Sequence, residues 1–463
     1  MFVLQKLMWI IFYRYVNNFK FIINLIMKTT KILFIFLITG ICLFAKPNLP
    51  NNKIKNRTLV NTSHLDNLYQ KIEIDGKQMG IIHIYANYPE YKYVDAPGEG
   101  IACVDDAARA AIFYMNYYEI KHNSVYLNKV EMLTKFMLYM QSDNGFFYNF
   151  ISSDFKINKT YKTSVAEPNW WSWRAIWELS EAYNFFLKYD KSFASEIYPL
   201  LNKSMIATIH WLQQNKPDTL QNFGGFNIPS WLPYGNASDQ AAVIIKGFLD
   251  YNKSVRDSVV RNEIIRLCKG IEKMQAGDSS TLPYYAFLSW ENKWHLWGNN
   301  QAEALIDAGK RLKNQNFIKA AQNEVLNFYP YLIKYNYMSN FTVIHKNNKS
   351  IFADSLKYGQ IAYGISPMVL ASCKLYNVDK NIQSAKIAGL LGCWFFGENP
   401  TGKQIYNIKT GVCYDGINNA NEINMNSGAE STIEALFAML AIEQNPIAKQ
   451  IVWNYYDKHI LKH

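Results

Sequence analysis

Four carboxylates that could perform acid–base chemistry stand at the starts of predicted helices. Asp105 and Asp106 open the alanine-rich stretch VDDAARAA, Glu167 precedes three tryptophans, and Glu430 lies in the stretch SGAESTIEAL. Glycoside hydrolysis needs two carboxyl groups, one that protonates the leaving oxygen and one that acts as base or nucleophile. We therefore interpret these four residues as the candidate catalytic groups.

Their positions suggest different roles. The first turn of a helix favours an ionised carboxylate, so Asp105 or Asp106 suits the base, and the sequence does not decide between them. The acid must hold its proton near neutral pH, which requires apolar surroundings or a nearby negative charge. Glu430 is the first candidate for this role, and Glu167 is the second.

The same predicted loops collect aromatic and amide side chains. Aromatic faces stack on the apolar faces of sugar rings, while polar side chains bind hydroxyl groups. This combination predicts a carbohydrate-binding cleft. The candidate substrate-binding residues are Trp170, Trp171, Trp173, Arg174, Trp231, Tyr234, Trp294, Trp297, Tyr358 and Asn426.

A purely structural interpretation remains open for each of these residues. The carboxylates could cap helices, Arg109 could pair with Asp105 or Asp106, and part of the aromatic set could belong to the core. Capping alone does not require aromatic residues to gather in the same loops. The combination therefore favours a functional site.

The elements that would position these residues repeat along the chain. A polar residue, then small residues, then an apolar helical run recurs at intervals of about 60 to 72 residues. Such a period accommodates one helix out and one helix back, so six units predict an all-α (α/α)6 toroid. The six starting residues are Asp106, Glu167, Asp239, Asn300, Gln360 and Glu430.

Hydrophobic periodicity gives the expected helices. The inner helices are predicted at 106–120, 170–187, 239–251, 300–312, 359–376 and 430–444. Their outer partners are predicted at 126–141, 193–213, 257–274, 317–333, 381–394 and 446–460. Alternation on both sides of Asp75-Gly76 predicts a small N-terminal β-hairpin, and little other strand is expected.

Composition excludes several classes of function. The net charge is +11, but residues 1–45 carry five Lys/Arg and no acidic residue, which leaves +6 for the remainder. This charge is spread out and is not typical of a nucleic-acid-binding surface. The cysteines show no metal-ligand spacing and are expected to be core thiols, so no metal or cofactor is predicted.

The N-terminus predicts export. A basic stretch after Met27 is followed by an apolar run, so residues 1–45 are interpreted as an upstream extension plus a signal peptide, with Met27 as the start. A retained membrane anchor is the alternative. Residues 46–67 would form a flexible lead-in and 68–463 a single catalytic domain. We expect a secreted or periplasmic monomer without stable membrane insertion after cleavage.

The chain resembles the six-hairpin glycosidases, most nearly the endoglucanase-like enzymes of glycoside hydrolase family 9. The motif GENPTG at 397–402 and the acidic residue in NSGAESTIEAL at 426–436 carry this resemblance. It implies that Asp105 or Asp106 is the base that activates water and that Glu430 is the acid. The family's Asp-Ala-Gly-Asp is replaced by Val-Asp-Asp-Ala, and its His-His-Arg motif is absent before Glu430.

The resulting hypothesis is an inverting glycoside hydrolase that acts on a poly- or oligosaccharide. The first alternative is a polysaccharide lyase that uses Tyr234, Tyr358 and Arg174. A sugar epimerase on this fold would want a pair of histidines, whereas His295 stands alone. The non-enzymatic alternative is a carbohydrate-binding protein.

Overall fold

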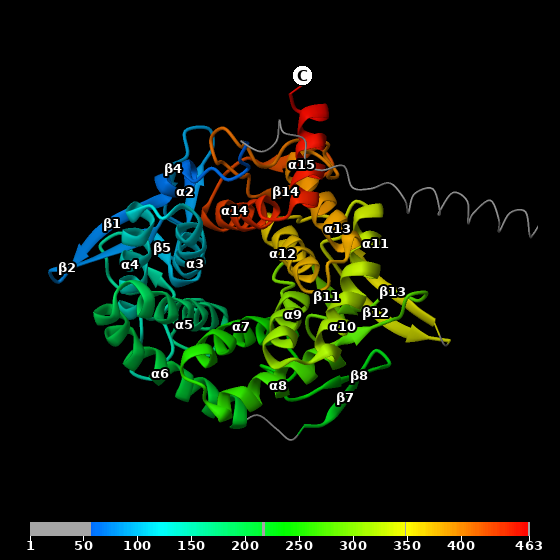
Figure 1. Ribbon diagram of the computed structural model, residues 1–463, viewed down its shortest axis with the longest axis horizontal. Helices are drawn as coiled ribbons and strands as arrows, with labels where there is room; N and C mark the ends of the chain where they lie inside the picture. The colour runs from blue at the N-terminus through cyan, green and yellow to red at the C-terminus, as the bar shows by residue number, and fades with distance from the viewer. Residues whose placement is uncertain (1–56, 215–217, 348, 462–463) are drawn as a thin grey trace, which may run out of the picture. The chain divides into compact units, whose positions relative to one another are not determined.

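A computed structural model describes residues 57–214, 218–347 and 349–461 of the chain. The predicted extension and signal peptide, as well as residues 46–56 of the lead-in, lie outside the described residues. Within the described ranges, none of the helices combines the length and the hydropathy that crossing a membrane requires. Residues 57–461 belong to one compact unit, which Figure 1 shows as a closed ring of helices.

Six helices of the described chain form an inner ring. Each contacts the next in sequence, and the last contacts the first, so the ring closes (Figure 1). The fold is the predicted (α/α)6 toroid. The inner helices are α3 (Val104–Lys121), α5 (Trp170–Tyr189), α7 (Ser238–Ser254), α9 (Gln301–Leu312), α12 (Ala362–Asp379) and α14 (Ala429–Glu443).

The outer layer consists of helices that return along the ring. Most begin at an Asn or Asp whose side chain accepts a hydrogen bond from the first backbone N–H groups, as at Asn123, Asp257 and Asn445. The outer elements are α4 (Ser124–Tyr139), α6 (Lys191–Gln214), α8 (Ser258–Lys273), α10 (Gln315–Asn323), η2 (Glu324–Phe328), α11 (Tyr329–Lys334), α13 (Ile382–Cys393) and α15 (Pro446–His459).

One outer element differs from its prediction. The expected single helix at 317–333 is α10, a π-helical turn and α11 in succession. Pro330, which the first turn of α11 accommodates, would lie in the interior of a single helix over 317–333, where its missing N–H and its ring oppose a regular ladder of hydrogen bonds. Two further short helical elements are α2 (Ser63–Leu68) and η3 (Trp394–Phe396).

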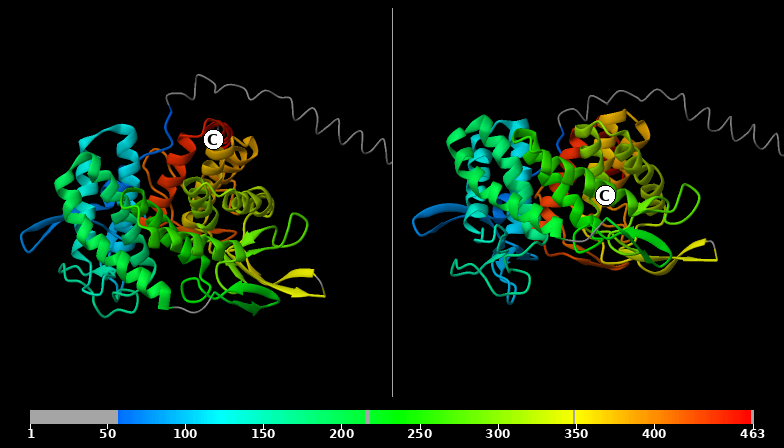
Figure 2. Two further views of the ribbon diagram at one scale, coloured as in Figure 1. Left: turned by 60° about the horizontal axis from the view of Figure 1, so that its bottom comes forward. Right: turned by 90° about the horizontal axis from the view of Figure 1, so that it is seen from below.

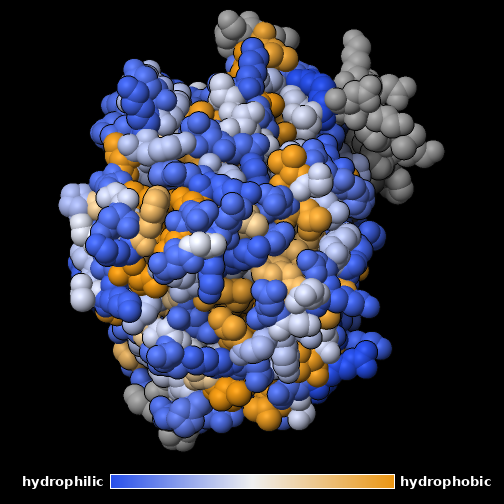
Figure 3. Space-filling view, turned by 90° about the vertical axis from the view of Figure 1, so that its left-hand side faces the viewer, coloured by the Kyte–Doolittle hydropathy of each residue, from blue (hydrophilic) through white to orange (hydrophobic). Residues whose placement is uncertain are grey.

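The inner helices are buried around most of their circumference, because they pack against neighbours on either side and against the outer layer. In α3, four alanines at 107, 108, 110 and 111 are fully buried and allow this close approach. The five described cysteines are free and buried, as expected for core thiols. On the outer side shown in Figure 3, hydrophilic residues cover most of the surface, with apolar residues scattered between them.

The long connections all lie at one end of the ring. Each inner helix is followed by its outer partner after only a few residues, whereas the segments that lead into the inner helices are long. The N-termini of the inner helices and these long segments therefore share one face of the ring. Figure 2 shows the strands gathered on that side.

These long segments contain more strand than the sequence predicted. The predicted N-terminal hairpin is present as β1 (Tyr69–Ile74) and β2 (Lys77–Ile82), joined by Asp75 and Gly76, both with positive φ. Antiparallel pairs also form between β3 (Tyr85–Asn87) and β4 (Lys92–Val94), β5 (Ala102–Cys103) and β6 (Phe150–Ile151), β7 (Leu220–Phe223) and β8 (Phe226–Pro229), β9 (Gln275–Ala276) and β10 (Ala286–Phe287), and β14 (Gly416–Asn419) and β15 (Glu422–Asn424). A three-stranded sheet contains β11 (Lys293–His295), β12 (Asn340–Lys346) and β13 (Lys349–Leu356).

Candidate active site

A pocket of about 340 Å³ opens where the N-termini of α3 and α14 meet. It is strongly acidic, because the charged residues among its lining are mostly carboxylates and Arg109 is their cationic neighbour. The pocket therefore brings together residues from the first and the last inner helix. Its lining carboxylates are Glu99, Asp105, Asp106, Asp415 and Glu430.

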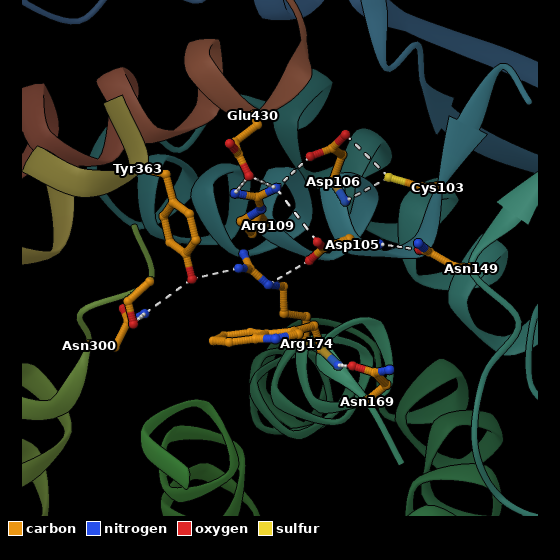
Figure 4. A network of polar contacts seen from close by, with 12 residues as sticks. Cys103, Asp105, Asp106, Arg109, Asn149, Asn169, Arg174, Asn300, Tyr363 and Glu430 are labelled. Atoms are coloured by element: carbon orange, nitrogen blue, oxygen red, sulfur yellow. Dashed lines mark hydrogen bonds and ion pairs between the residues drawn. The ribbon is translucent and has the colours of Figure 1, made fainter. Parts of the chain in front are cut away.

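Arg109 joins the two helices at the base of this pocket (Figure 4). Its side chain is only 2% exposed. Nη2 lies 2.6 Å from Oδ1 of Asp106 and 3.2 Å from Oε2 of Glu430, while Nη1 lies 3.1 Å from Oε1 of Glu434. A buried guanidinium with several carboxylates around it fixes their relative positions.

The shared guanidinium limits how far apart the carboxylates lie. Oδ2 of Asp105 is 3.9 Å from Nη2 of Arg109, so it lies at most 7.1 Å from Oε2 of Glu430, the sum of the two distances. The same reasoning places Oδ1 of Asp106 within 5.8 Å of that oxygen. Inverting glycosidases separate their carboxyl groups by about 6.5–9.5 Å to admit a water. The upper limit for the Asp105–Glu430 pair includes the lower part of that range and also the separation of roughly 5–5.5 Å that retaining enzymes use.

Asp105 has a second cationic partner. Nε of Arg174 lies 2.5 Å from Oδ1 of Asp105, and Nη2 of Arg174 donates to the hydroxyl of Tyr363 at 2.6 Å. Asn300 also donates to that hydroxyl, at 3.2 Å. The side chain of Asp105 remains 24% exposed, while Arg174 is buried. Arg174, predicted to bind substrate, thus contacts a candidate catalytic residue.

Asp106 is buried, and burial raises its pKa to about 6, although Arg109 acts in the opposite direction. Cys103 is the N-cap of α3: its Sγ accepts from the backbone N–H of Asp106 and donates to Oδ2 of that residue. Asp106 is therefore held in place by Arg109 and Cys103. Its carboxyl group exchanges a proton close to neutral pH.

This raised pKa predicts a pH-dependent stability. A carboxyl group whose pKa is higher in the folded than in the unfolded chain stabilises the fold at low pH, and the stabilisation is lost as pH rises. For Asp106 the loss falls between about pH 4, the ordinary value, and pH 6. We expect urea unfolding to show this loss in the wild type and its absence in Asp106→Asn. Parallel pH profiles for the two proteins would contradict the assignment.

Asp415 is a pocket residue that the sequence did not single out. Its Oδ1 accepts from the backbone N–H of Gly428 at 2.8 Å and from the hydroxyl of Ser431 at 2.6 Å. Burial raises its pKa against these two hydrogen bonds, and Glu430 adds to the rise. Asp415 lies in a long loop, so no helix start marks it in the sequence. Glu434 could have been found from the sequence, because it follows Glu430 by about one helical turn and therefore shares its face of the predicted helix.

Glu167 does not line this pocket. Its Oε1 accepts a hydrogen bond from Asn169 at 2.9 Å, and Asn169 in turn caps α5. Among the four candidate catalytic residues, the structure brings together Asp105, Asp106 and Glu430 and leaves Glu167 outside their network.

Two of the predicted aromatic residues form a wall near Arg174, outside the lining of the acidic pocket. Trp170 is half-buried and Trp297 is 38% exposed, with their ring centroids 5.8 Å apart. The guanidinium of Arg174 lies 5.8 Å from the centre of the Trp170 ring. Through Arg174, this wall adjoins Asp105.

Four other predicted aromatics are buried. Trp171, Trp173 and Trp231 donate their indole N–H to protein acceptors, and Trp294 stacks on Phe341. The structure places these four in the core, where protein covers the ring faces that were expected to stack on a substrate. Loop position alone did not reveal this burial.

The remaining candidates have other positions. Tyr234 is exposed and donates to the carbonyl of Pro168, and Tyr358 is half-buried near β13; neither lines the acidic pocket. Oδ1 of Asn426 accepts from the backbone N–H of Tyr88 at 3.1 Å. Asn426 thus positions a neighbouring segment at the edge of the pocket.

His295 lies apart from the pocket. Its Nε2 is 2.9 Å from Oδ2 of Asp239, both side chains are buried, and its ring stacks on Trp297. Among the residues the structure describes, the lining of the acidic pocket contains no histidine. The same part of the chain contains no group of three His, Cys, Asp or Glu side chains arranged to hold a metal ion.

A larger cavity of about 620 Å³ runs along the ring axis on the other side of Arg109 and Arg174. Most of its acidic residues are paired with lysines or arginines. Glu303 lies 2.8 Å from Lys246 and 2.7 Å from Lys374, which also contacts Asp307. Because these charges compensate one another, we place the candidate chemistry in the smaller pocket.

Comparison with known proteins supports the fold assignment. No family model matches the sequence, and no curated protein matches it. Among solved structures, a sugar epimerase from a ruminal bacterium aligns with TM-score 0.55 and 11% identity over 85% of this chain and 97% of its own. The similarity supports the (α/α)6 toroid fold of this chain.

One glycoside hydrolase shares this fold, and a second aligns less well. A family 76 enzyme from a bovine Bacteroides thetaiotaomicron strain aligns with TM-score 0.51 and 13% identity over 84% of this chain and 79% of its own. A family 9 cellulase of C. cellulolyticum aligns with TM-score 0.45 and 9% identity over 79% and 88%. At these identities the similarity concerns the fold alone.

Proposed function

We propose that this chain is a glycoside hydrolase that cleaves a poly- or oligosaccharide with inversion, with Asp105 as the base and Glu430 as the acid. One observation carries the proposal. Asp105 and Glu430, with side chains 24% and 42% exposed, face the same pocket and are held by one buried guanidinium. Two carboxyl groups across a substrate-sized pocket are what glycosidic cleavage requires.

In the proposed reaction, Asp105 takes a proton from a water molecule as the water oxygen bonds to the anomeric carbon. Glu430 donates its proton to the glycosidic oxygen as the bond from that oxygen to the anomeric carbon breaks. Both hydrogen bonds from Arg109 reach Oε2 of Glu430, so Oε1 is the oxygen that Arg109 leaves free to face the glycosidic oxygen. The surrounding carboxylates stabilise the positive charge that develops on the sugar ring.

Charge and residue types argue against the lyase. A uronate would meet an acidic pocket, and Arg174 is already engaged by Asp105. The proposed lyase tyrosines Tyr234 and Tyr358 lie outside the pocket lining. A pure binding protein would gain little from burying Arg109 among carboxylates, since buried ion pairs are costly to form.

The fold neighbours include a sugar epimerase, and epimerisation is the competing enzymatic activity. The described pocket lining offers carboxylates for proton transfer and no histidine pair. We therefore favour hydrolysis. Export, predicted from residues 1–45, is part of this proposal, because an extracellular enzyme would meet polymeric glycans.

The proposal predicts the products. Incubating the protein with neutral glycans should yield new reducing ends without the ultraviolet absorbance of unsaturated sugars, and NMR should show the inverted anomer first. Absorbance at the unsaturated product would establish a lyase instead. A changed sugar composition without new reducing ends would establish an epimerase.

A further inference from the structure

A hairpin rich in tyrosine borders the acidic pocket and was not predicted to have a function. It comprises β3, β4 and their turn, residues 85–94, and we name it the tyrosine hairpin. Tyr85, Tyr88 and Tyr93 are among the exposed large side chains of the described chain, with Tyr88 49% exposed. Exposed aromatic rings beside a pocket are typical of ligand-binding surfaces.

The tyrosine hairpin is fixed against the catalytic helices. Tyr85 lines the pocket, and its hydroxyl donates to Oε2 of Glu99 at 2.9 Å. The backbone of Ser427, just before α14, donates to the carbonyl of Ala86 at 3.1 Å, and Asn426 accepts from the N–H of Tyr88. These contacts hold the hairpin next to the start of the helix that carries Glu430.

A second aromatic surface, the Trp170–Trp297 wall, comes from other segments than the carboxylates. Trp170 begins α5, and Trp297 precedes α9, whereas Asp105 and Glu430 belong to α3 and α14. In the closed ring, α9 stands across the axis from the junction of α3 and α14 (Figure 1). The hairpin packs on the segment before α14, away from that axis. The tyrosine hairpin therefore adjoins the pocket from the segment before α14, and the Trp170–Trp297 wall approaches Asp105 through Arg174 from α5 and the segment before α9.

We propose that the tyrosine hairpin is a sugar-binding platform and that the substrate is a neutral glycan chain with sugar units on both sides of the cleaved bond. This inference rests on the proposed function. Sugar rings stack on Tyr88 and on Trp297. The acidic lining of the pocket selects against chains that carry uronates.

Calorimetric titration tests the platform without relying on turnover. Asp105→Asn protein would be titrated with cello-oligosaccharides and manno-oligosaccharides from di- to hexasaccharide. We expect affinity to rise with chain length, because longer chains reach both aromatic surfaces. Adding Tyr88→Ala should weaken hexasaccharide binding by roughly 3- to 10-fold and leave disaccharide binding unchanged.

Two further variants serve as controls. Tyr88→Phe keeps the ring and should bind as the parent does. Tyr335→Ala removes a tyrosine of similar exposure, 51%, that lies outside the pocket lining, and should also leave affinity unchanged. A folding defect in Tyr88→Ala would appear as weaker binding of every chain length.

The outcomes separate this inference from the proposed function. Length-dependent binding that needs Tyr88, in a wild-type protein that releases no reducing ends, would support the platform and overturn hydrolysis. Cleavage with hexasaccharide affinity unaffected by Tyr88→Ala would support hydrolysis and overturn the platform. Absence of binding to both series also overturns the platform.

Discussion

Asp105→Asn should reduce kcat by roughly 10²- to 10⁴-fold, the usual contribution of a general base. Asparagine keeps the size of the side chain but does not accept a proton from water. Substrate contacts are largely retained, so we expect KM to change little. Initial rates of reducing-end release over a range of glycan concentrations measure both parameters.

A matched variant controls for the loss of an ion pair. Asp250 pairs with Arg311 at 2.6 Å near the C-terminal end of α7, on the opposite side of the ring from the pocket. Asp250→Asn should leave kcat within about twofold of the wild type. Equal rates in Asp105→Asn and the wild type would remove Asp105 from the mechanism.

Arg109→Met should lower the free energy of unfolding by about 3–5 kcal/mol, because it leaves buried carboxylates without their cation. Asp106 and Glu434 are both buried and both contact Arg109 within 3.1 Å. Protonation of these groups removes their repulsion, so the destabilisation should shrink as pH falls from 8 to 5. Urea unfolding at several pH values measures this dependence.

Lys188→Met is the control for that experiment. Lys188 pairs with Glu119 at 2.9 Å, but its side chain is largely exposed, so the loss of stability should be far smaller than in Arg109→Met and should depend little on pH. A comparably small effect of Arg109→Met would mean that the network around it does not hold the two helices together.

The repeating sequence pattern predicted the ring because every unit buries its inner helix in the same way. Small residues at the start of each inner helix and apolar residues at helical spacing mark an element that is buried around most of its circumference. Interruptions of the helical pattern were harder to predict. Pro330 changed one outer helix, and the long segments before the inner helices fold into hairpins through pairings that local patterns do not reveal.

The candidate site was predictable where it coincides with helix starts. Asp105, Asp106 and Glu430 were found in this way, and closure of the ring brings them together. Asp415 and the tyrosine hairpin were missed, because their place at the pocket depends on contacts between segments far apart in the chain. Trp173 and Trp294 were predicted to bind substrate but lie in the core, because aromatic residue type does not distinguish a core position from a binding surface.

Closure of the ring also sets when the chain acquires its site during synthesis. Glu430 contacts Arg109 across 321 positions of sequence, so the acid joins the base only after the last helical pair has emerged from the ribosome and docked. A nascent or truncated chain that lacks α14 would hold Asp105 and Asp106 without their proton-donating partner. The proposed enzyme therefore has no complete active site until α14, which carries Glu430, has packed against the rest of the ring.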